Sequence, residues 1–293
     1  MALDQVEDID RLAEIEKAKR QGTEPEEQGD MSFVEHIDAM RWHIIRAVIA
    51  IFVLTIVAFI FNGFIFDYII LAPTKPDFFT YQKLCEFATL VDAPALCITD
   101  LPDDMLYNRK MTGQFTIHVT SSLIAGIIIA FPYIFWEIWS FIKPALYNSE
   151  KSFATGTTLV VSFLFFIGVL FGYYIISPLT YNFFVHYSVS DTIHNEFDLS
   201  SYISIVTNMV LVCGLMFQLP VASYFLGKLG ILSPGIMIEK RKHAVVIILF
   251  AAAIFTPADV FSQLLVAIPL FFLYQISIFV VRISYGRYKK NQL

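Results

Sequence analysis

The feature that most constrains this chain is an uncharged, largely apolar stretch, residues 153–190, that contains no Asp, Glu, Lys or Arg. One helical crossing of a bilayer needs about 20 consecutive apolar residues. Only 16% of all residues are charged and 57% are hydrophobic, whereas soluble domains carry about 25% charged residues. The sequence therefore predicts a membrane protein that crosses the bilayer several times.

Further apolar regions accompany this stretch, and each is expected to form a helix. In chain order, the regions cover about residues 44–66, 119–139, 153–176, 202–226, 244–255 and 261–281. Pro178 is expected to end the third helix and to leave a short interfacial segment, residues 178–187, because proline breaks helices. We expect an all-α integral membrane protein with six transmembrane helices, of which the fifth and sixth are short.

The positions of the basic residues predict the orientation. With six crossings, sixteen of the twenty Lys and Arg residues fall on the side that holds both termini. The other four lie in the long first outer loop, about residues 67–118. Cytoplasmic loops carry an excess of Lys and Arg. Both termini are therefore expected to be cytoplasmic, and the long first loop periplasmic, in a protein of the bacterial inner membrane.

The N-terminal part of the chain has a different charge balance from the rest. Twelve of the 26 acidic residues lie among the first 38 positions, and this part is too poor in apolar side chains to fold alone. We expect residues 1–32 to be an acidic, disordered cytoplasmic tail, residues 33–287 the membrane domain, and residues 288–293 a short tail. Residues 1–33 contain no apolar core of a cleaved signal peptide.

The three cysteines have different expected environments. Cys85 and Cys97 lie in the first outer loop, where an oxidising compartment permits a disulfide. The alternative is a pair of reduced, partly buried thiols, and the sequence leaves both open. Cys213 lies in an apolar helix and is expected to be inert packing.

The sequence lacks the motifs of several classes of function. The chain has no Walker-type loop, HExxH or GxSxG motif, and its six histidines are scattered without ligand spacing. We expect no enzyme activity, cofactor, metal or nucleic-acid partner. The alternative function is a channel or secondary transporter for a small solute, but neither repeated halves nor converging mid-membrane charges are present.

Polar residues within the apolar regions are informative because a polar group in a membrane is costly unless it is paired. They are Glu137, Asn208, Gln218, Asp259 and Gln263. Each is either a satisfied helix contact or interfacial anchor, or a functional position. Gln218 comes shortly before Pro220, which is expected to kink the helix. Asp259 either caps the sixth helix or acts together with Gln263, one turn later on the same face.

The segment 131–151, FPYIFWEIWSFIKPALYNSEK, is typical of a helix that leaves a membrane. Its Trp and Tyr residues favour the headgroup level, and Pro144 ends the helix. Glu150 then offers a carboxylate to a cationic ligand.

This segment resembles the first cytoplasmic loop of TatC, the multispanning subunit of the twin-arginine protein translocase. The family pattern is close to P-x-x-x-x-x-x-W-x-F-x-x-P-A-L-Y-x-x-E. The matching residues are Pro132, Trp139, Phe141, Pro144, Ala145, Leu146, Tyr147 and Glu150. Three further stretches agree in order: HIDAMRWHIIR, FQLPVA and TPADVFSQLLVAIPL.

The resemblance implies a subunit that recognises signal peptides bearing two adjacent arginines and exports folded proteins with the proton-motive force. It assigns signal-peptide binding to Phe141 and Glu150 in the loop and to Arg41 before the first crossing, with Pro144 and Tyr147 beside them. It also implies TatA- and TatB-type single-span partners, further copies of the chain and membrane lipid. The expected partner contacts are Gln218, where many members have Glu, with Pro220, Asp259 and Gln263.

The chain departs from the family pattern before the first crossing. The pattern there is near H-L-x-E-L-R-x-R, but Ala39 replaces the glutamate and His43 replaces the second basic residue. Glu35 lies one helical turn before Ala39, on the same face. We hypothesise that Glu35, or as second choice Asp38, supplies the missing carboxylate.

Overall fold

The computed structural model describes residues 33–93, 97–98, 106–142, 154–190, 192, 195–256 and 259–291. The chain forms two compact units, Met1–His43 and Ile44–Leu293. The first long helix, α2 (Phe33–Ile60), begins in the first unit and continues into the second. The boundaries expected for the two tails and the membrane domain stay predictions.

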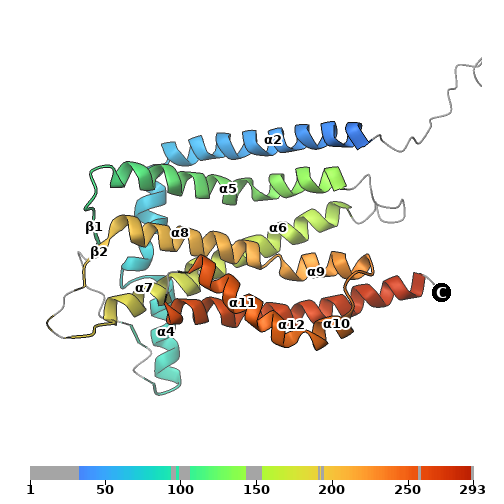
Figure 1. Cartoon of the computed structure of the whole chain (residues 1–293). Helices are drawn as coiled ribbons and strands as arrows, with labels where there is room; N and C mark the ends of the chain where they lie inside the picture. The colour runs from blue at the N-terminus through green and yellow to red at the C-terminus, as the bar shows by residue number, and fades with distance from the viewer. Residues whose placement is uncertain are drawn as a thin grey trace, which may run out of the picture. The chain divides into compact units, whose positions relative to one another are not determined.

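Five helical segments in the described part of the chain are long and apolar enough to cross a membrane. They are Met40–Ile60, Gly113–Phe141, Gly156–His186, Leu199–Lys228 and Val260–Gly286. They belong to α2, to α5 (Gly113–Ile142), to α6 (Ala154–Phe171) with α7 (Ser177–His186), to α8 (Leu199–Met216) with α9 (Leu219–Lys228), and to α12 (Val260–Asn291). Within Ile44–Leu293, α8 packs against α5 and α6, and α9 packs against α12 (Figure 1).

The expected fifth crossing is α11 (Arg241–Phe255), which follows the short helix α10 (Pro234–Glu239). The 15 residues of α11 span about 22 Å at 1.5 Å per residue, against about 30 Å of hydrocarbon in a bilayer. The fifth helix is therefore short, as predicted. The count of six crossings and the side on which the termini lie stay predictions.

The prediction of a short sixth helix is wrong, because α12 contains 32 residues. The apolar run ends near Val281, but the helix continues through the basic residues that follow as far as Asn291. Arg and Lys are good helix formers, so the helix extends beyond its apolar part. Pro269 lies inside the helix without ending it.

The predicted break of the third helix at Pro178 is also wrong. α6 passes through the π-helical segment η6 (Gly172–Ile176) directly into α7. A proline removes the N–H that would bond the carbonyl four residues earlier, which here is the carbonyl of Tyr174. Thr80 Oγ1 donates a hydrogen bond to that carbonyl. Because the freed carbonyl is satisfied from outside the helix, the helix continues through the proline.

Glycines allow α6 and α8 to pack with their backbones in contact. A Cβ atom added at Gly168 would lie 2.6 Å from the carbonyl oxygen of Cys213 and 2.9 Å from the Cα of Gly214. A Cβ at Gly172, one turn later, would lie 3.0 Å from the Cβ of Cys213. Small residues spaced four apart are typical of close helix packing in membranes, so these glycines set the distance between α6 and α8.

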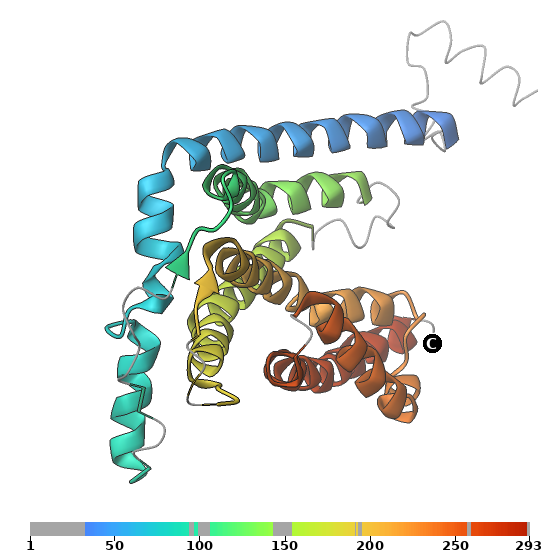
Figure 2. The same ribbon diagram turned by 60° about the vertical axis from the view of Figure 1, so that its left-hand side comes forward.

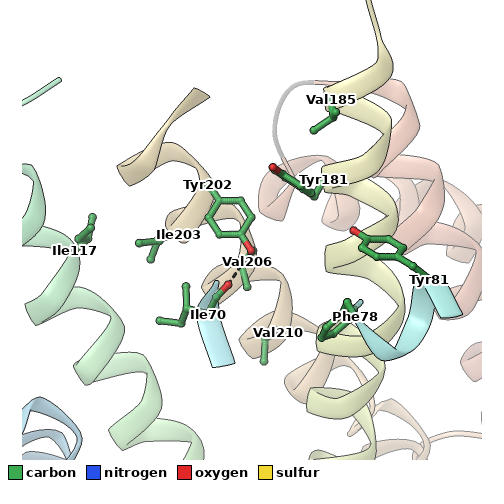
Figure 3. Packing of buried hydrophobic residues seen from close by; sticks show 10 residues of the cluster. All are labelled: Ile70, Phe78, Tyr81, Ile117, Tyr181, Val185, Tyr202, Ile203, Val206 and Val210. Carbon is green, nitrogen blue, oxygen red and sulfur yellow. Dashed lines mark hydrogen bonds between the residues drawn. The ribbon is translucent and has the colours of Figure 1, made fainter. Parts of the chain in front are cut away.

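Tyrosine side chains attach the segment that follows α2 to the helices behind it. Tyr202 on α8 donates a hydrogen bond of 2.7 Å to the carbonyl of Ile70 (Figure 3). Tyr81 donates to the carbonyls of Pro73, at 2.9 Å, and Pro178, at 3.1 Å. Burial raises the pKa of the Tyr81 phenol far above its ordinary value, with a smaller contribution from Tyr181. Tyr81 is therefore a neutral donor throughout the physiological range.

The segment between α2 and α5 is long, as expected, and carries its own structure. It contains α3 (Asn62–Phe64), the π-helical η1 (Ile65–Ile70), the 3₁₀ turn η2 (Ala72–Thr74), α4 (Phe79–Leu90) and β1 (Leu106–Tyr107). In both views, α4 runs across the direction of α5 (Figures 1 and 2). β1 pairs in parallel with β2 (Phe197–Asp198), which immediately precedes α8. This pairing connects the two segments that lead into α5 and α8.

Candidate functional site

The base of the predicted signal-peptide loop is the C-terminal part of α5, which packs firmly onto its neighbours. Trp139 is only 8% exposed. Its ring stacks on Phe135, with centroids 6.1 Å apart, and meets the ring of Phe225 on α9 at 4.6 Å. Aromatic pairs at these separations add to the stabilisation from burial. The loop therefore starts from a rigid position.

A buried carboxylate lies half a turn before this tryptophan. Glu137 is 2% exposed, and its Oε1 accepts a hydrogen bond of 2.7 Å from the Tyr133 hydroxyl. Burial of a carboxylate is costly unless hydrogen bonds compensate for the lost water. This contact matches the interpretation of Glu137 as a satisfied contact, here within α5 itself.

The residues predicted to bind the signal peptide are only partly within the described chain. Phe141 is half-buried in the last turn of α5, and Arg41 is exposed on α2 in the first unit. Pro144, Tyr147 and Glu150 lie outside the described residues. Their role in signal-peptide binding stays a prediction.

The hypothesis about Glu35 assumes that the chain is helical from about Phe33, and the backbone is helical there. α2 includes every residue from Phe33 onward, so Glu35 lies one turn before Ala39 on the same face of the helix. The side chains of Glu35 and Asp38 lie outside what the structure describes. Their proposed contribution stays a prediction.

Gln218 lies at the break between α8 and α9. Pro220 occupies the first turn of α9 and is buried. Gln218 Nε2 donates a hydrogen bond of 3.2 Å to the carbonyl of Val161 on α6. Its Oε1 is buried, and it has no hydrogen-bond partner among the described residues. Gln218 thus connects α6 to the α8–α9 break through its amide N–H.

An apolar cavity of about 660 Å³ is lined by residues close to Gln218 in the chain, although Gln218 is not part of the lining. Val161 and Pro220 line it, together with residues of α6, α9 and α12 such as Leu164, Tyr224 and Ile276. The cavity is therefore apolar and lies between α6, α9 and α12 near the α8–α9 break.

Asp259 and Gln263 hold the connection between α11 and α12. Asp259 Oδ1 accepts a 2.7 Å hydrogen bond from the Ser262 N–H, which is how an acidic residue caps a helix. Gln263 Nε2 donates at 2.9 Å to the carbonyl of Leu249 on α11. Gln218 contacts α6, whereas Gln263 contacts α11. The predicted partner contacts therefore lie in two separate places, and their binding role stays a prediction.

The two loop cysteines are close in space. The structure pairs Cys85, in α4, with Cys97 as a disulfide. This arrangement favours the disulfide over the alternative of two reduced thiols. Cys213 is a buried free cysteine, and burial matches its expected packing role.

Two sets of important residues were not identified from the sequence. The close-packing glycines were detectable, because GVLFG at residues 168–172 is a GxxxG pattern. The tyrosines that hold the segment after α2, Tyr81, Tyr173 and Tyr202, had no such signal. Their partners are backbone carbonyls, such as that of Ile69 for Tyr173 at 2.8 Å, and no pattern of side chains marks a carbonyl acceptor.

Comparison with known proteins extends these observations to almost the whole chain. The sequence model of one family, described as Sec-independent protein translocase protein (TatC), matches residues 35–269. A protein of that name from Blattabacterium sp. subsp. Periplaneta americana is 40% identical over 255 residues, covering 87% of this chain and 96% of the relative. Another, from Aquifex aeolicus, is 32% identical over 263 residues, covering 89% and 99%.

A solved structure agrees in fold. The crystal structure described as Twin Arginine Translocase Receptor- TatC superimposes with a TM-score of 0.67 at 30% identity, covering 85% of this chain and 99% of that chain. The resemblance inferred from the four sequence stretches is thereby confirmed.

Proposed function

Since the chain belongs to the TatC family of Sec-independent protein translocase proteins, we propose that it is the subunit of the twin-arginine translocase that receives signal peptides. Folded proteins that carry these signals are then exported across the cytoplasmic membrane at the expense of the proton-motive force. The match over residues 35–269 carries this conclusion. A solute channel or secondary transporter is not favoured.

We propose that the protein lies in the inner membrane with both termini in the cytoplasm. The support is the excess of Lys and Arg in the segments that flank α9, α10 and the end of α12. In this orientation, α4 and the β1–β2 ladder lie on the periplasmic side, where Cys85 and Cys97 can form their disulfide.

Signal-peptide recognition is proposed for the loop that follows α5. An arginine pair needs carboxylates at fixed positions and is stabilised by neighbouring aromatic surface. Glu150 supplies a carboxylate, and Phe141 supplies aromatic surface on the rigid last turn of α5. Arg41, Pro144 and Tyr147 complete the proposed site, with Glu35 or Asp38 as the second carboxylate.

Partner recruitment is proposed for the polar residues within the membrane. Gln218 offers its buried Oε1 near the residues that line the apolar cavity of about 660 Å³, and Pro220 forms part of the cavity wall. Asp259 and Gln263 mark a second contact at the α11–α12 connection. The proposed partners are TatA- and TatB-type single-span subunits, with further copies of this chain and membrane lipid around them.

The decisive experiment is site-specific crosslinking to a twin-arginine signal peptide. A photoreactive residue introduced at Phe141 in membranes should crosslink to a signal peptide with two arginines and not to one with two lysines. Lys lacks the planar, bidentate donor set of Arg, so the lysine peptide is a matched control. Equal crosslinking of both peptides, or of neither, would contradict the proposed function.

A further inference from the structure

α8 presents a polar stripe on its exposed surface where an apolar one is expected. Ser201, Ser204 and Asn208 are all exposed, and their spacing of three and four residues places them on one face. Asn208 Nδ2 donates to Ser204 Oγ at 3.3 Å. All three lie inside the membrane-spanning segment Leu199–Lys228. Lipid cannot satisfy such groups, so something polar must cover this face.

The stripe forms one wall of a polar pocket of about 790 Å³. Arg109 and Lys110, which precede α5, also line the pocket, as do Ile254 and Thr256 at the end of α11. The part of the pocket beside Arg109 and Lys110 is called its mouth. The pocket therefore joins charged residues at the end of the bundle to an amide well inside the helix.

The charges at the mouth are held in place. Arg109 forms an ion pair with Glu196, and β1 pairs with β2 just beside it. Asp198 accepts hydrogen bonds from the hydroxyl and the N–H of Ser200. The Ser200 hydroxyl is the main reason that the pKa of the Asp198 carboxyl lies below its ordinary value. The Asp198 carboxylate thus stays ionised at physiological pH.

We propose that this pocket is a water-filled inlet that enters the membrane from the periplasmic side and ends at Asn208. The side of entry rests on the orientation proposed above. Asn208 is nine residues beyond Leu199, which corresponds to about 14 Å along the helix, nearly half of the ~30 Å hydrocarbon thickness. Gln218 lies ten residues further, about 15 Å along the chain of helices. The inlet therefore shortens the stretch of apolar membrane between the periplasm and Gln218, where partner recruitment is proposed.

Water explains the pocket better than a bound transmembrane helix. A partner helix would cover α8 along its length and would need matching groups throughout. The polar stripe instead stops at Asn208, and the next strongly exposed residue, Leu215, is apolar and 49% exposed. A polar outer half with a charged mouth is what a water-filled cavity requires.

Thiol labelling tests the inlet in membranes that contain the complete translocase. Ser204→Cys and Asn208→Cys are made in a Cys213→Ala background, with Cys85 and Cys97 left paired. A charged, membrane-impermeant thiol reagent is added to each side of the membrane in turn. The matched control is Leu123→Cys, which lies ten residues into α5, is 43% exposed and is apolar at the same depth.

Both α8 cysteines are expected to react at least about tenfold faster than Leu123→Cys, because an apolar environment raises a thiol pKa and each unit lowers the reactive thiolate about tenfold. Rates equal to that of Leu123→Cys overturn the inlet. Fast labelling only after the single-span partners are removed also overturns it, because a partner helix then fills the pocket.

The orientation is judged separately with Lys110→Cys at the mouth. Labelling of this cysteine only from the cytoplasmic side would overturn the proposed orientation, whereas the rate ratio between Asn208→Cys and Leu123→Cys decides whether water fills the pocket. Retained export of a twin-arginine substrate confirms that each variant is folded.

Discussion

At the residue scale, the hydrogen bond from Gln218 Nε2 to Val161 defines what this amide offers to a partner. One of its N–H groups is used at 3.2 Å, and its buried Oε1 accepts nothing from the described residues. An amide cannot carry charge, which argues against proton transfer at this position. If a partner helix contacts Gln218, as we propose, it must bring a hydrogen-bond donor for Oε1.

Gln218→Leu is expected to weaken the recruitment of single-span partners more than signal-peptide binding. An interhelical hydrogen bond in a membrane is worth about 0.6–2 kcal/mol. The measurement is co-purification of the partners together with signal-peptide crosslinking. Leu219→Ala, which truncates the neighbouring apolar side chain, controls for lost packing. If both functions survive in Gln218→Leu, the residue serves only to hold α6.

Glu150→Ala is expected to weaken signal-peptide binding while the protein remains in the membrane at its normal level. A hydrogen bond to a charged group is worth about 1.5–3 kcal/mol, which corresponds to about 10- to 150-fold in affinity. Glu239→Ala removes an exposed carboxylate from a different part of the chain and is the matched control. Unchanged crosslinking and export in Glu150→Ala would remove this residue from the site.

At the element scale, the helical start of α2 bears on which carboxylate can replace the family glutamate that is missing at Ala39. Because α2 is helical from Phe33, Glu35 lies one turn earlier on the same face as Ala39, whereas Asp38 is rotated by about 100° from it. The alternative role for both is negative charge near a helix N-terminus, worth about 0.3–1 kcal/mol.

Glu35→Ala is therefore expected to abolish export of a twin-arginine substrate, and a second change, Ala39→Glu, is expected to restore it. The carboxylate introduced at position 39 would lie one helical turn after position 35, on the same face of α2. Export assays on the single and double variants make the comparison. If Glu35→Ala and Asp38→Ala leave export untouched, alone and together, recognition does not use this face.

The glycine contact between α6 and α8 allows a stability prediction. Gly168→Ala places a Cβ atom 2.6 Å from a backbone oxygen of α8, and overpacking of this kind costs about 1–3 kcal/mol. Gly156→Ala, in the same helix, meets nothing within 4 Å among the described atoms and should be neutral or stabilising, because Ala is the better helix former. Thermal unfolding in detergent compares the two. Equal unfolding temperatures would show that α6 and α8 can separate without cost.

The elements also show what the sequence can and cannot predict. Apolar runs located the five long apolar helical segments of the described chain, because burial in lipid imposes a length and a composition. Helix ends were less predictable. Pro178 did not break its helix because Thr80, distant in sequence, satisfies the freed carbonyl, and α12 continued beyond its apolar part. At the candidate site, the sequence motif around Glu150 could be recognised. The hydrogen bond of Gln218 could not be predicted, because its acceptor is a backbone carbonyl on another helix.

At the scale of the whole molecule, the number of crossings and the positions of the termini constrain each other. An odd number of crossings puts the two ends of the chain on opposite sides. The five long segments alone would therefore separate the termini. Yet four basic residues follow Val281 and six lie in the N-terminal region, and Lys and Arg are enriched on the cytoplasmic side. The two observations agree only if the short helix α11 also crosses.

We therefore expect α11 to span a locally thinned bilayer with its 15 residues, since a helix of about 22 Å can be accommodated at a modest cost per ångström of mismatch. A reporter that is active only outside the cytoplasm should be inactive when attached after Leu293 and active when inserted near Thr192 or directly after Thr256. Activity after Leu293 with none after Thr256 would mean that α11 does not cross. The protein would then have five crossings, and the basic C-terminal end of α12 would lie in the periplasm against the distribution of charge.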